Sequence, residues 1–360
     1  MTTDGDYDAP GAPGPDGPSG AIGERDEPSP QATTAAPTPA GELGALRGGV
    51  DLGGTKIEAI VVDADNKVLG SARHPTPTSG GPGDVADEIA ATVREAAVAA
   101  GVSTHALCGI GVGSPGAVDA DAGTVTSARN LPGWDGTYAL ADELSRRLGA
   151  PTKLGNDVAV ATTAEFELGA ARGRSSVLGV FWGTGVGGGL VLDARPFHGR
   201  GGAGEIGHVV VKDHGRRCGC GNRGCLEAYA GRAALEARAR KEIHNGRRSK
   251  LPKLMKQRGR DRFTSSVWWH AVDRRDQLAI ELIAGAVEAL ATGIASACNL
   301  LDVELVLIGG GLGVRFGEPY VQRIRRAMAP HLFPGHAAPD VELVALGDLG
   351  GALGAALLAA

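Results

Sequence analysis

The chain has 360 residues, which suits one large or two medium domains and supplies enough apolar material for a buried core. Its formal net charge of −5 gives no support to nucleic-acid binding, and no uninterrupted apolar run reaches transmembrane length. The odd number of cysteines, five, and an N-terminus without a basic-then-apolar signal pattern favour a reduced, cytoplasmic protein. The 58 glycines predict many tight turns or loops that approach a phosphate closely.

The first 45 residues are dominated by Pro, Gly, Ala, Thr and acids, with almost no large apolar side chain. Such a segment cannot bury enough surface to offset the entropy lost on ordering. We therefore expect residues 1–45 to be a disordered acidic tail. Composition favours a solvated extension over a partner-binding segment.

The folded part is expected to open on a strand near residue 47, followed by a glycine turn and strands at 57–62 and 67–73. The turn reads Asp51-Leu-Gly53-Gly54-Thr55-Lys56. Adjacent glycines let backbone N–H groups approach a phosphate, Thr55 and Lys56 add donors, and Asp51 could hold Mg²⁺ through water. The alternative is an ordinary hairpin turn.

Two helices are expected next. The first spans residues 84–100, with Asp84 as N-cap and Gly101 after its end, and the second carries Leu140, Leu144 and Leu148 and ends at Gly149. A strand at 108–112 leads into the turn at 113–116, which either borders a ligand or is a simple loop.

The dipeptide Asn156-Asp157 lies between a short strand at 153–155 and a helix at 159–168. An aspartate at such a junction is usually an N-cap. The functional alternative is a general base, because a carboxylate at the mouth of a sheet can accept the proton of a sugar hydroxyl.

Two further glycine segments follow strands. A buried strand at 176–181 precedes the run from Gly183 to Gly189, in which Gly183, Thr184, Gly185 and Gly187 form a second candidate phosphate cradle before a strand at 190–192. This run joins strand to strand, unlike a dinucleotide-binding fingerprint. A long amphipathic helix from 280 to 297, with Cys298 in the core, then leads to a strand at 304–308 and to Gly309, Gly310 and Gly311, which could lie against an adenine or ribose.

A histidine and three cysteines are concentrated within a short segment: His208, Cys218, Cys220 and Cys225. This is a set that closes a tetrahedral zinc site. Glu205 and Glu227 flank it, so we expect zinc to fix a loop that presents Glu205, His208 and Glu227 to a substrate. A nucleic-acid zinc module is disfavoured by the flanking acids, the Cys-x-Cys spacing and the negative net charge.

Residues 238–262 contain eleven Lys or Arg and two acids, and Gly246, Pro252 and Gly259 should interrupt any long helix. A solvated surface insertion is favoured over a site for an anionic polymer such as nucleic acid or polyphosphate. The pair Trp268-Trp269 could be a packing anchor or an oligomer contact.

Together the two strand–glycine–strand loops, Asn156-Asp157 and the late glycine triplet resemble the sugar kinases of the actin-like ATPase superfamily. Glu-x-Gly-His followed by Cys-x-Cys-Gly-x-x-Gly-Cys-x-Glu is similar to the ROK family, and to its bacterial glucokinases in particular, over about residues 47–360. The combined pattern from Glu205 to Glu227 is specific, whereas each glycine loop alone is weak.

The resemblance implies an α/β fold of two domains around a cleft, with ATP and a hexose bound between them. The implied organisation is an N-terminal domain at 46–155, completed by a C-terminal helix at 347–360, and a C-terminal domain at 156–346 that carries the metal motif and the basic insertion 238–262. A homodimer or higher homo-oligomer is expected.

The resemblance also assigns roles. Asp157 is implied to be the catalytic base, Asn156, Glu205, His208 and Glu227 to hold sugar hydroxyls, and His208, Cys218, Cys220 and Cys225 to bind structural Zn²⁺. The implied contacts of ATP and Mg²⁺ are Asp51, Gly53, Gly54, Thr55, Lys56, Gly183, Thr184, Gly185, Gly187, Gly309, Gly310 and Gly311. Phosphoryl transfer needs positioning and charge neutralisation, which these residue types supply.

Several alternatives stay open. Glucose is the first substrate to consider, but the same hydroxyl-binding set suits N-acetylmannosamine, N-acetylglucosamine or fructose. A non-catalytic, sugar-responsive regulator is a second class, although the first 45 residues cannot form the helix-turn-helix domain of ROK repressors. The basic insertion leaves polyphosphate open as a donor in place of ATP. Val158, where the family usually has Ala, is a small departure from its pattern.

Overall fold

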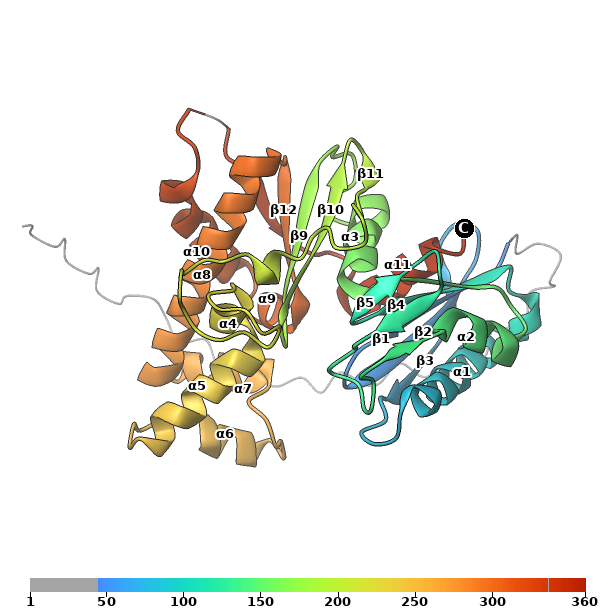
Figure 1. Cartoon of the computed structure of the whole chain (residues 1–360), viewed down its shortest axis with the longest axis horizontal. Coiled ribbons are helices and arrows are strands. Elements are labelled where there is room, and N and C mark those ends of the chain that lie inside the picture. The colour runs from blue at the N-terminus through green and yellow to red at the C-terminus, as the bar shows by residue number, and fades with distance from the viewer. Residues whose placement is uncertain (1–44, 336) are drawn as a thin grey trace, which may run out of the picture. The chain divides into compact units, whose positions relative to one another are not determined.

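A computed structural model describes residues 45–335 and 337–360, so the predicted tail at 1–45 lies outside the described residues apart from its last position. The first sheet has five strands in the order β3-β2-β1-β4-β8 (Figure 1). The three N-terminal strands pair antiparallel through hairpins, and β1, β4 and β8 run parallel. The strands are β1 (Arg47–Leu52), β2 (Lys56–Val62), β3 (Val68–Pro75), β4 (Gly109–Ser114) and β8 (Thr152–Asn156).

The second sheet repeats this topology, in the order β11-β10-β9-β12-β13. Two antiparallel hairpins again come first, and β9, β12 and β13 run parallel. The first two glycine turns of the sequence therefore each join the first two strands of a sheet. The strands are β9 (Val177–Trp182), β10 (Val186–Leu192), β11 (Arg195–Pro196), β12 (Leu305–Gly309) and β13 (Asp340–Leu343).

Helices α1 and α2 cover the first sheet and close a core that contains Ile89, Val93, Leu140 and Leu144. The helix α2 (Leu140–Leu148) ends at Gly149 in the left-handed conformation, as predicted. The helix α1 (Pro82–Ala99) begins earlier than predicted: Gly81 is the N-cap. Asp84 lies in the first turn, and its carboxylate accepts a hydrogen bond from the Gly81 N–H at 2.8 Å. The expectation that Asp84 caps the helix was wrong because Pro82 is well suited to the first helical position.

A small sheet of β5 (Ala117–Asp119), β6 (Thr124–Thr126) and β7 (Thr137–Tyr138) follows β4 in the chain. The predicted turn at 113–116 is shorter than expected, since Gly113 and Ser114 still belong to β4.

The core on the second sheet is organised around α8 (Gln277–Leu301), whose N-cap is Asp276. Ile283, Val287, Leu290 and Ile294 are buried on it, as the spacing predicts. By length and composition alone this helix is long and apolar enough to cross a membrane, although its sequence contains Glu281 and Glu288. Its apolar face packs in the protein core, which is the ordinary reason for such a composition.

Four other helices of this half, α4, α5, α7 and α10, pack against α8. Figure 1 shows α10 beside α8 and the group α5, α6 and α7 at one end of it. Their bounds are α4 (Glu227–Ala230), α5 (Arg232–His244), α6 (Leu251–Gln257), α7 (Ser265–Asp273), α9 (Gly310–Phe316) and α10 (Glu318–Met328). Short 3₁₀ turns lie at Thr104–Ala106, Ile206–His208, Ala329–His331 and Gly347–Leu349.

Two helices connect elements that are distant in sequence. The helix α3 (Asp157–Leu168) packs on β9 and β10, and α11 (Gly350–Leu357) packs on β1 and β4 and against α3. Glycines on the first sheet allow this approach, since a Cβ at Gly49 would lie 2.1 Å from the Ala352 carbonyl oxygen and one at Gly111 would lie 1.7 Å from that of Ala355. The C-terminal helix thus contacts the first sheet, while the predicted domain boundaries remain a prediction.

Candidate active site

The sequence-predicted metal ligands converge. One ligand atom from each of His208, Cys218, Cys220 and Cys225 lies within 4.8 Å of all the others. The His208 Nδ1–Cys218 Sγ and Cys220 Sγ–Cys225 Sγ distances are both 3.7 Å. A tetrahedral ion with bonds of about 2.3 Å needs ligand atoms about 3.8 Å apart. The donor set and spacing therefore fit a structural zinc ion.

The backbone of the metal loop explains this convergence. The 3₁₀ turn Ile206–His208 carries the histidine, and the Cys218 N–H donates to the Asn222 carbonyl at 2.8 Å, which folds the cysteine turn back on itself. Gly224 has φ +82°, and a Cβ there would lie 1.9 Å from the Lys212 carbonyl oxygen. Only glycine fits that crossing of the loop.

Asn156, rather than Asp157, takes the N-cap position that the sequence left open. Asn156 is the N-cap of α3, and its Oδ1 accepts hydrogen bonds from the Val158 and Ala159 N–H groups, both at 3.1 Å. The N-cap interpretation of Asp157 was therefore wrong, because its neighbour takes that position. Asp157 lies in the first helical turn, where its Oδ1 accepts from the Val158 N–H at 2.9 Å.

Asp157 lies near two other carboxylates. Strand register places Asp51 opposite Gly113 and Gly113 opposite Gly155, so Asp51 and Asp157 sit at the same edge of the first sheet. Burial, and then the negative charges of Asp51 and Glu205, raise the pKa of Asp157 to about 6, while the hydrogen bond from Val158 opposes the shift. A carboxylate with a pKa close to neutral is well matched to general-base chemistry.

The first glycine turn lies beside Asp51. Burial raises the pKa of Asp51, and the positive charge of Lys56 opposes this. The Lys56 ammonium is bonded to the buried carboxylate of Glu58, which also holds Arg73. In this arrangement Lys56 is an ion-pair partner of Glu58, a role that its place after two glycines did not reveal.

The second glycine turn is shorter than predicted. The expectation of a loop through Gly189 was wrong, because β10 begins at Val186 and Gly187 pairs with Phe181 of β9. A Cβ at Gly187 would lie 2.6 Å from Val158 Cγ2, so this glycine allows α3 to pack on the strand. The turn itself consists of Gly183, Thr184 and Gly185.

Residues that follow the metal loop hold this turn. The Glu227 Oε2 accepts a hydrogen bond from the Val186 N–H at 3.0 Å, and its Oε1 lies 3.7 Å from Cys218 Sγ. Arg232 Nη2 donates to Thr184 Oγ1 at 2.7 Å. Sequence reasoning missed Arg232, which belongs to no motif and is recognised only by its contact. Glu227 therefore links the metal cluster to the second glycine turn.

The third glycine segment lies next to the second. Gly310 has φ +76° at the start of α9, and a Cβ there would lie 2.7 Å from the Trp182 backbone. A Cβ at Gly183 would lie 3.8 Å from the Gly311 nitrogen. The structure thus brings Gly183 and Gly311 together.

The remaining predicted residues lie around these groups. Glu205 is exposed and His208 is half-buried, and 3.9 Å separates Glu205 Oε2 from His208 Nε2. The loop after β6 reaches both the first glycine turn and the metal loop: a Cβ at Gly54 would lie 2.9 Å from the Asn130 carbonyl oxygen, and Arg129 donates a hydrogen bond to the Gly219 carbonyl. Sequence reasoning gave Arg129 no role.

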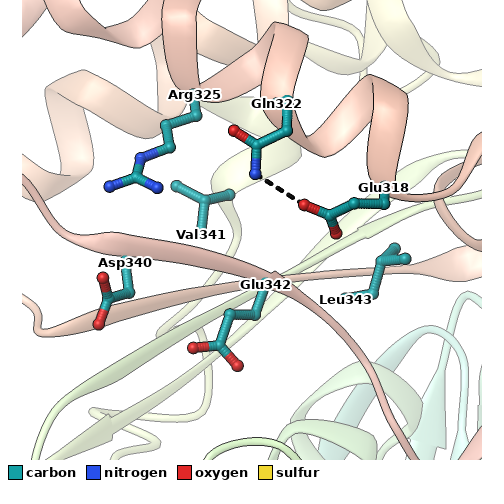
Figure 2. Close-up of a pocket in the computed structure, with 7 residues that line it drawn as sticks. All are labelled: Glu318, Gln322, Arg325, Asp340, Val341, Glu342 and Leu343. Carbon is teal, nitrogen blue, oxygen red and sulfur yellow. Dashed lines mark hydrogen bonds between the residues drawn. The ribbon is translucent and has the colours of Figure 1, made fainter.

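One cavity lies apart from all these residues. It has a volume of about 360 Å³ and lies between α10 and β13 (Figure 2). Its polar lining includes Glu318, Arg325, Asp340 and Glu342, and it contains none of the predicted site residues.

Comparison with known proteins is consistent with this arrangement. A glucokinase of Thermotoga maritima is 34% identical over 311 residues, covering 86% of this chain and 95% of the relative. An N-acetyl-D-glucosamine kinase of Pectobacterium atrosepticum is 32% identical over 321 residues, covering 86% and 97%. The crystal structure of a ROK family glucokinase from Streptomyces griseus in complex with glucose and AMPPNP matches with a TM-score of 0.75 and 31% identity, covering 87% and 99%.

These matches confirm the predicted fold class, the α/β fold of the actin-like sugar kinases. The model of the ROK family matches residues 47–360, nearly all of the described chain. The chain is a member of the ROK family.

Proposed function

We propose that this chain is an ATP-dependent sugar kinase that transfers the terminal phosphoryl group of ATP to a hexose, with glucose to glucose 6-phosphate as the first candidate. The observation that carries the proposal is Asp157: a carboxylate with a pKa of about 6, beside Asp51 and Glu205, in a chain of the ROK family. The 34% identical glucokinase supports the reaction class.

In the proposed mechanism Asp157 accepts the proton of the attacking sugar hydroxyl as its oxygen bonds to the phosphorus. Because its pKa is raised toward neutral, the carboxylate is ionised at pH 7 yet basic enough to take that proton. Asn156 fixes the start of α3 and so the position of Asp157. The sugar hydroxyls are proposed to contact Asn156, Glu205, His208 and Glu227.

The donor is proposed to lie along the three glycine segments, with Mg²⁺ near Asp51 and the phosphates near the N–H groups of residues 54–55 and 184–185. The Gly53 and Gly183 N–H groups close the two turns by donating to the Lys56 and Gly185 carbonyls. Phosphoryl transfer depends on such positioning and charge neutralisation. Lys56 would have to leave Glu58 to reach a phosphate. Gly187 contributes through packing on Val158, so its role in ATP binding is proposed to be indirect.

Zinc is proposed to bind His208, Cys218, Cys220 and Cys225 and to supply a rigid cross-link, with no part in proton or phosphoryl transfer. Glu227 would transmit this rigidity to the second glycine turn through Val186.

Cytoplasmic location and a homo-oligomeric state remain predictions. Of the pair Trp268-Trp269, Trp268 is fully buried, so only Trp269, which is 36% exposed, remains as a candidate oligomer contact.

The test is ADP release from ATP–Mg²⁺ across a panel of hexoses and N-acetylhexosamines, with zinc content measured on the same sample. We expect turnover with at least one sugar, and glucose to give the highest kcat/KM. A higher kcat/KM with N-acetylglucosamine than with glucose would instead identify N-acetylglucosamine as the substrate, the sugar that the Pectobacterium relative is named for. Zinc-loaded protein that turns over no sugar would contradict the proposal and favour a sugar-responsive regulator.

A further inference from the structure

Charged side chains gather on one face of the first sheet, beside the first glycine turn. The strand register places Asp51 of β1 opposite Glu58 of β2, and Glu58 opposite Arg73 of β3. Lys56 precedes Glu58 by two positions on β2 and therefore points to the same face of the sheet. Side chains that lie directly opposite on antiparallel strands are close enough to interact. The pairing of the three strands thus brings these four charges together.

Glu58 is the buried member of this charged row. Its side chain is only 5% exposed, yet both of its carboxylate oxygens accept hydrogen bonds from cations. Arg73 donates to Oε1 from Nε at 3.0 Å and from Nη2 at 2.7 Å, and Nη2 also lies 2.8 Å from Oε2. Lys56 Nζ donates to Oε2 at 2.5 Å. A buried carboxylate needs a partner for its charge, and here one negative charge holds two positive charges.

The two cations of Glu58 are not held equally. Arg73 contacts both carboxylate oxygens with a planar, rigid guanidinium, whereas Lys56 makes one contact from the end of a flexible stem. Arg73 has a second anchor in Asp348, whose Oδ2 lies 3.4 Å from Nη2. Lys56 is therefore the cation that can leave, because Arg73 remains to neutralise the buried carboxylate.

A released Lys56 ammonium would meet the proposed donor directly. Lys56 follows Thr55, one of the residues whose N–H groups are proposed to contact the phosphates. Burial raises the pKa of Asp51, and the nearby charge of Lys56 lowers it, while that of Glu58 raises it. Both members of the ion pair thus act electrostatically on the residue that is proposed to lie near Mg²⁺.

We propose that Glu58 is a positioning residue, which holds Lys56 at the first glycine turn until the donor binds, and that Lys56 then exchanges Glu58 for a donor phosphate. Arg73 makes this exchange possible, because it stays on Glu58 after the ammonium has left. The inference rests on the proposed kinase function. It adds that Glu58 and Arg73, which are proposed to contact neither ATP nor the sugar, have opposite effects on the affinity for ATP.

Two single variants separate these effects. In Glu58→Gln the ammonium of Lys56 no longer has to leave a carboxylate, so the KM for ATP should fall about threefold to tenfold. In Arg73→Gln the departure of Lys56 would leave a buried carboxylate unpaired, so the KM for ATP should rise about tenfold. Arg73→Lys keeps a positive charge beside Glu58 and should recover most of the affinity for ATP.

A Lys56→Gln background identifies the cause of these changes. Neither Glu58→Gln nor Arg73→Gln should change the KM for ATP by more than about twofold there, because no ammonium remains to be exchanged. All assays use saturating Mg²⁺, so that a weaker hold on Mg²⁺ at Asp51 does not alter the comparison. The KM for the sugar should stay constant in the single variants, which a general loss of structure would not allow.

Glu143 of α2 offers a matched control, because its carboxylate also bonds two cations, Arg146 and Arg147. Glu143→Gln and Arg147→Gln repeat the two charge changes on a helix that contains none of the proposed site residues. Both should leave the KM for ATP unchanged. Calorimetric titration of the same proteins with ATP–Mg²⁺, without sugar, measures the affinity for ATP independently of turnover.

Three results would overturn the inference. If Glu58→Gln and Arg73→Gln both raise the KM for ATP, the charged row only supports the sheet. If their effects persist in the Lys56→Gln background, Lys56 does not mediate them. Should Glu58→Gln fail to fold, the exposed Arg73 still carries the test, because an unchanged KM in Arg73→Gln would contradict the exchange.

Failure of the proposed function is distinguishable from failure of this exchange. If the wild-type protein phosphorylates no sugar, the proposed function fails, and the calorimetric affinities for ATP still decide the role of Glu58. Opposite changes of affinity in Glu58→Gln and Arg73→Gln would support the exchange even then. Equal affinities in wild type and both variants, or no binding of ATP by any of them, would overturn it.

Discussion

Asp157 shows how the surroundings of one residue decide its chemistry. Its position after a strand is that of a helix cap, yet Asn156 makes the capping hydrogen bonds. Burial, together with the charges of the nearby Asp51 and Glu205 carboxylates, holds the pKa of Asp157 at about 6. Ionising this carboxyl is less favourable in the folded protein than in the unfolded chain, as is common for catalytic carboxylates.

This difference in the pKa of Asp157 between the folded and unfolded states predicts that stability depends on pH. The pKa of Asp157 in the folded state lies above its ordinary value of 3.8, so the folded state binds the proton more tightly than the unfolded chain does. The stability that this bound proton contributes is lost as the pH rises from about 4 to 6. Asp157→Asn removes the ionisation, and should increase the free energy of unfolding at pH 8 by at most about 3 kcal/mol.

The measurement is urea unfolding of both proteins at pH 4 and pH 8. The gain should nearly vanish at pH 4, where the wild-type carboxyl is protonated in the folded state. Asp65→Asn, an exposed aspartate in a turn, is the matched control and should show no such difference. An equal gain at both pH values would contradict a raised pKa.

At the scale of elements, close backbone contacts through glycine fix where helices lie. The carbonyls of Ala352 and Ala355 on α11 approach Gly49 of β1 and Gly111 of β4 more closely than any Cβ would allow. Burial of the small α11 side chains against Ile60 and Val62 adds to this contact.

Gly111→Ala should therefore destabilise the protein by about 1–3 kcal/mol, because α11 must shift to relieve the overlap. Gly285→Ala is the matched control, since this glycine is exposed in α8 and a Cβ there meets no atom within 4 Å. It should be neutral or stabilise by up to about 1 kcal/mol. Thermal unfolding compares the two, and an unchanged Tm for Gly111→Ala would argue against the packing of α11 on β4.

The metal loop is the second element whose structure makes a prediction. Cys225→Ser removes a buried ligand of the His/Cys₃ set, and should lower bound zinc well below one ion per chain and lower the Tm. Cys108→Ser changes an exposed cysteine outside the set and should keep the full zinc content. Equal zinc in the two variants, measured by mass spectrometry of metals, would remove Cys225 from the site.

At the scale of the whole molecule, much of the fold follows from local patterns. The spacing of apolar residues located α2 and α8, and the glycine after Leu148 located a helix end. The convergence of His208, Cys218, Cys220 and Cys225 was predictable because a fixed donor set at short spacing is specific. Strand β10 began earlier than expected, since a run of glycines resembles a loop until its pairing with β9 is known.

Contacts between distant segments were not predictable from the chain alone. Nothing local indicates that Glu58 would hold both Lys56 and Arg73, that Arg232 would reach Thr184, or that Glu227 would bond Val186. The basic stretch was expected to be a solvated insertion. Its charge pattern could not separate arginines that pair with a glutamate, such as Arg240, from Arg258 and Arg260, which line a cavity beside Gly311. Such distinctions depend on which elements the tertiary fold places side by side.

The measurement that tests the central claim most directly is turnover by wild-type and Asp157→Asn protein, both zinc-loaded, with ATP–Mg²⁺ and the preferred sugar. A positioned base contributes roughly 10² to 10⁴ in rate, so the variant should lose that factor in kcat while its equilibrium affinity for the sugar changes little. A variant that keeps near-normal kcat would contradict the assignment of Asp157 as the base.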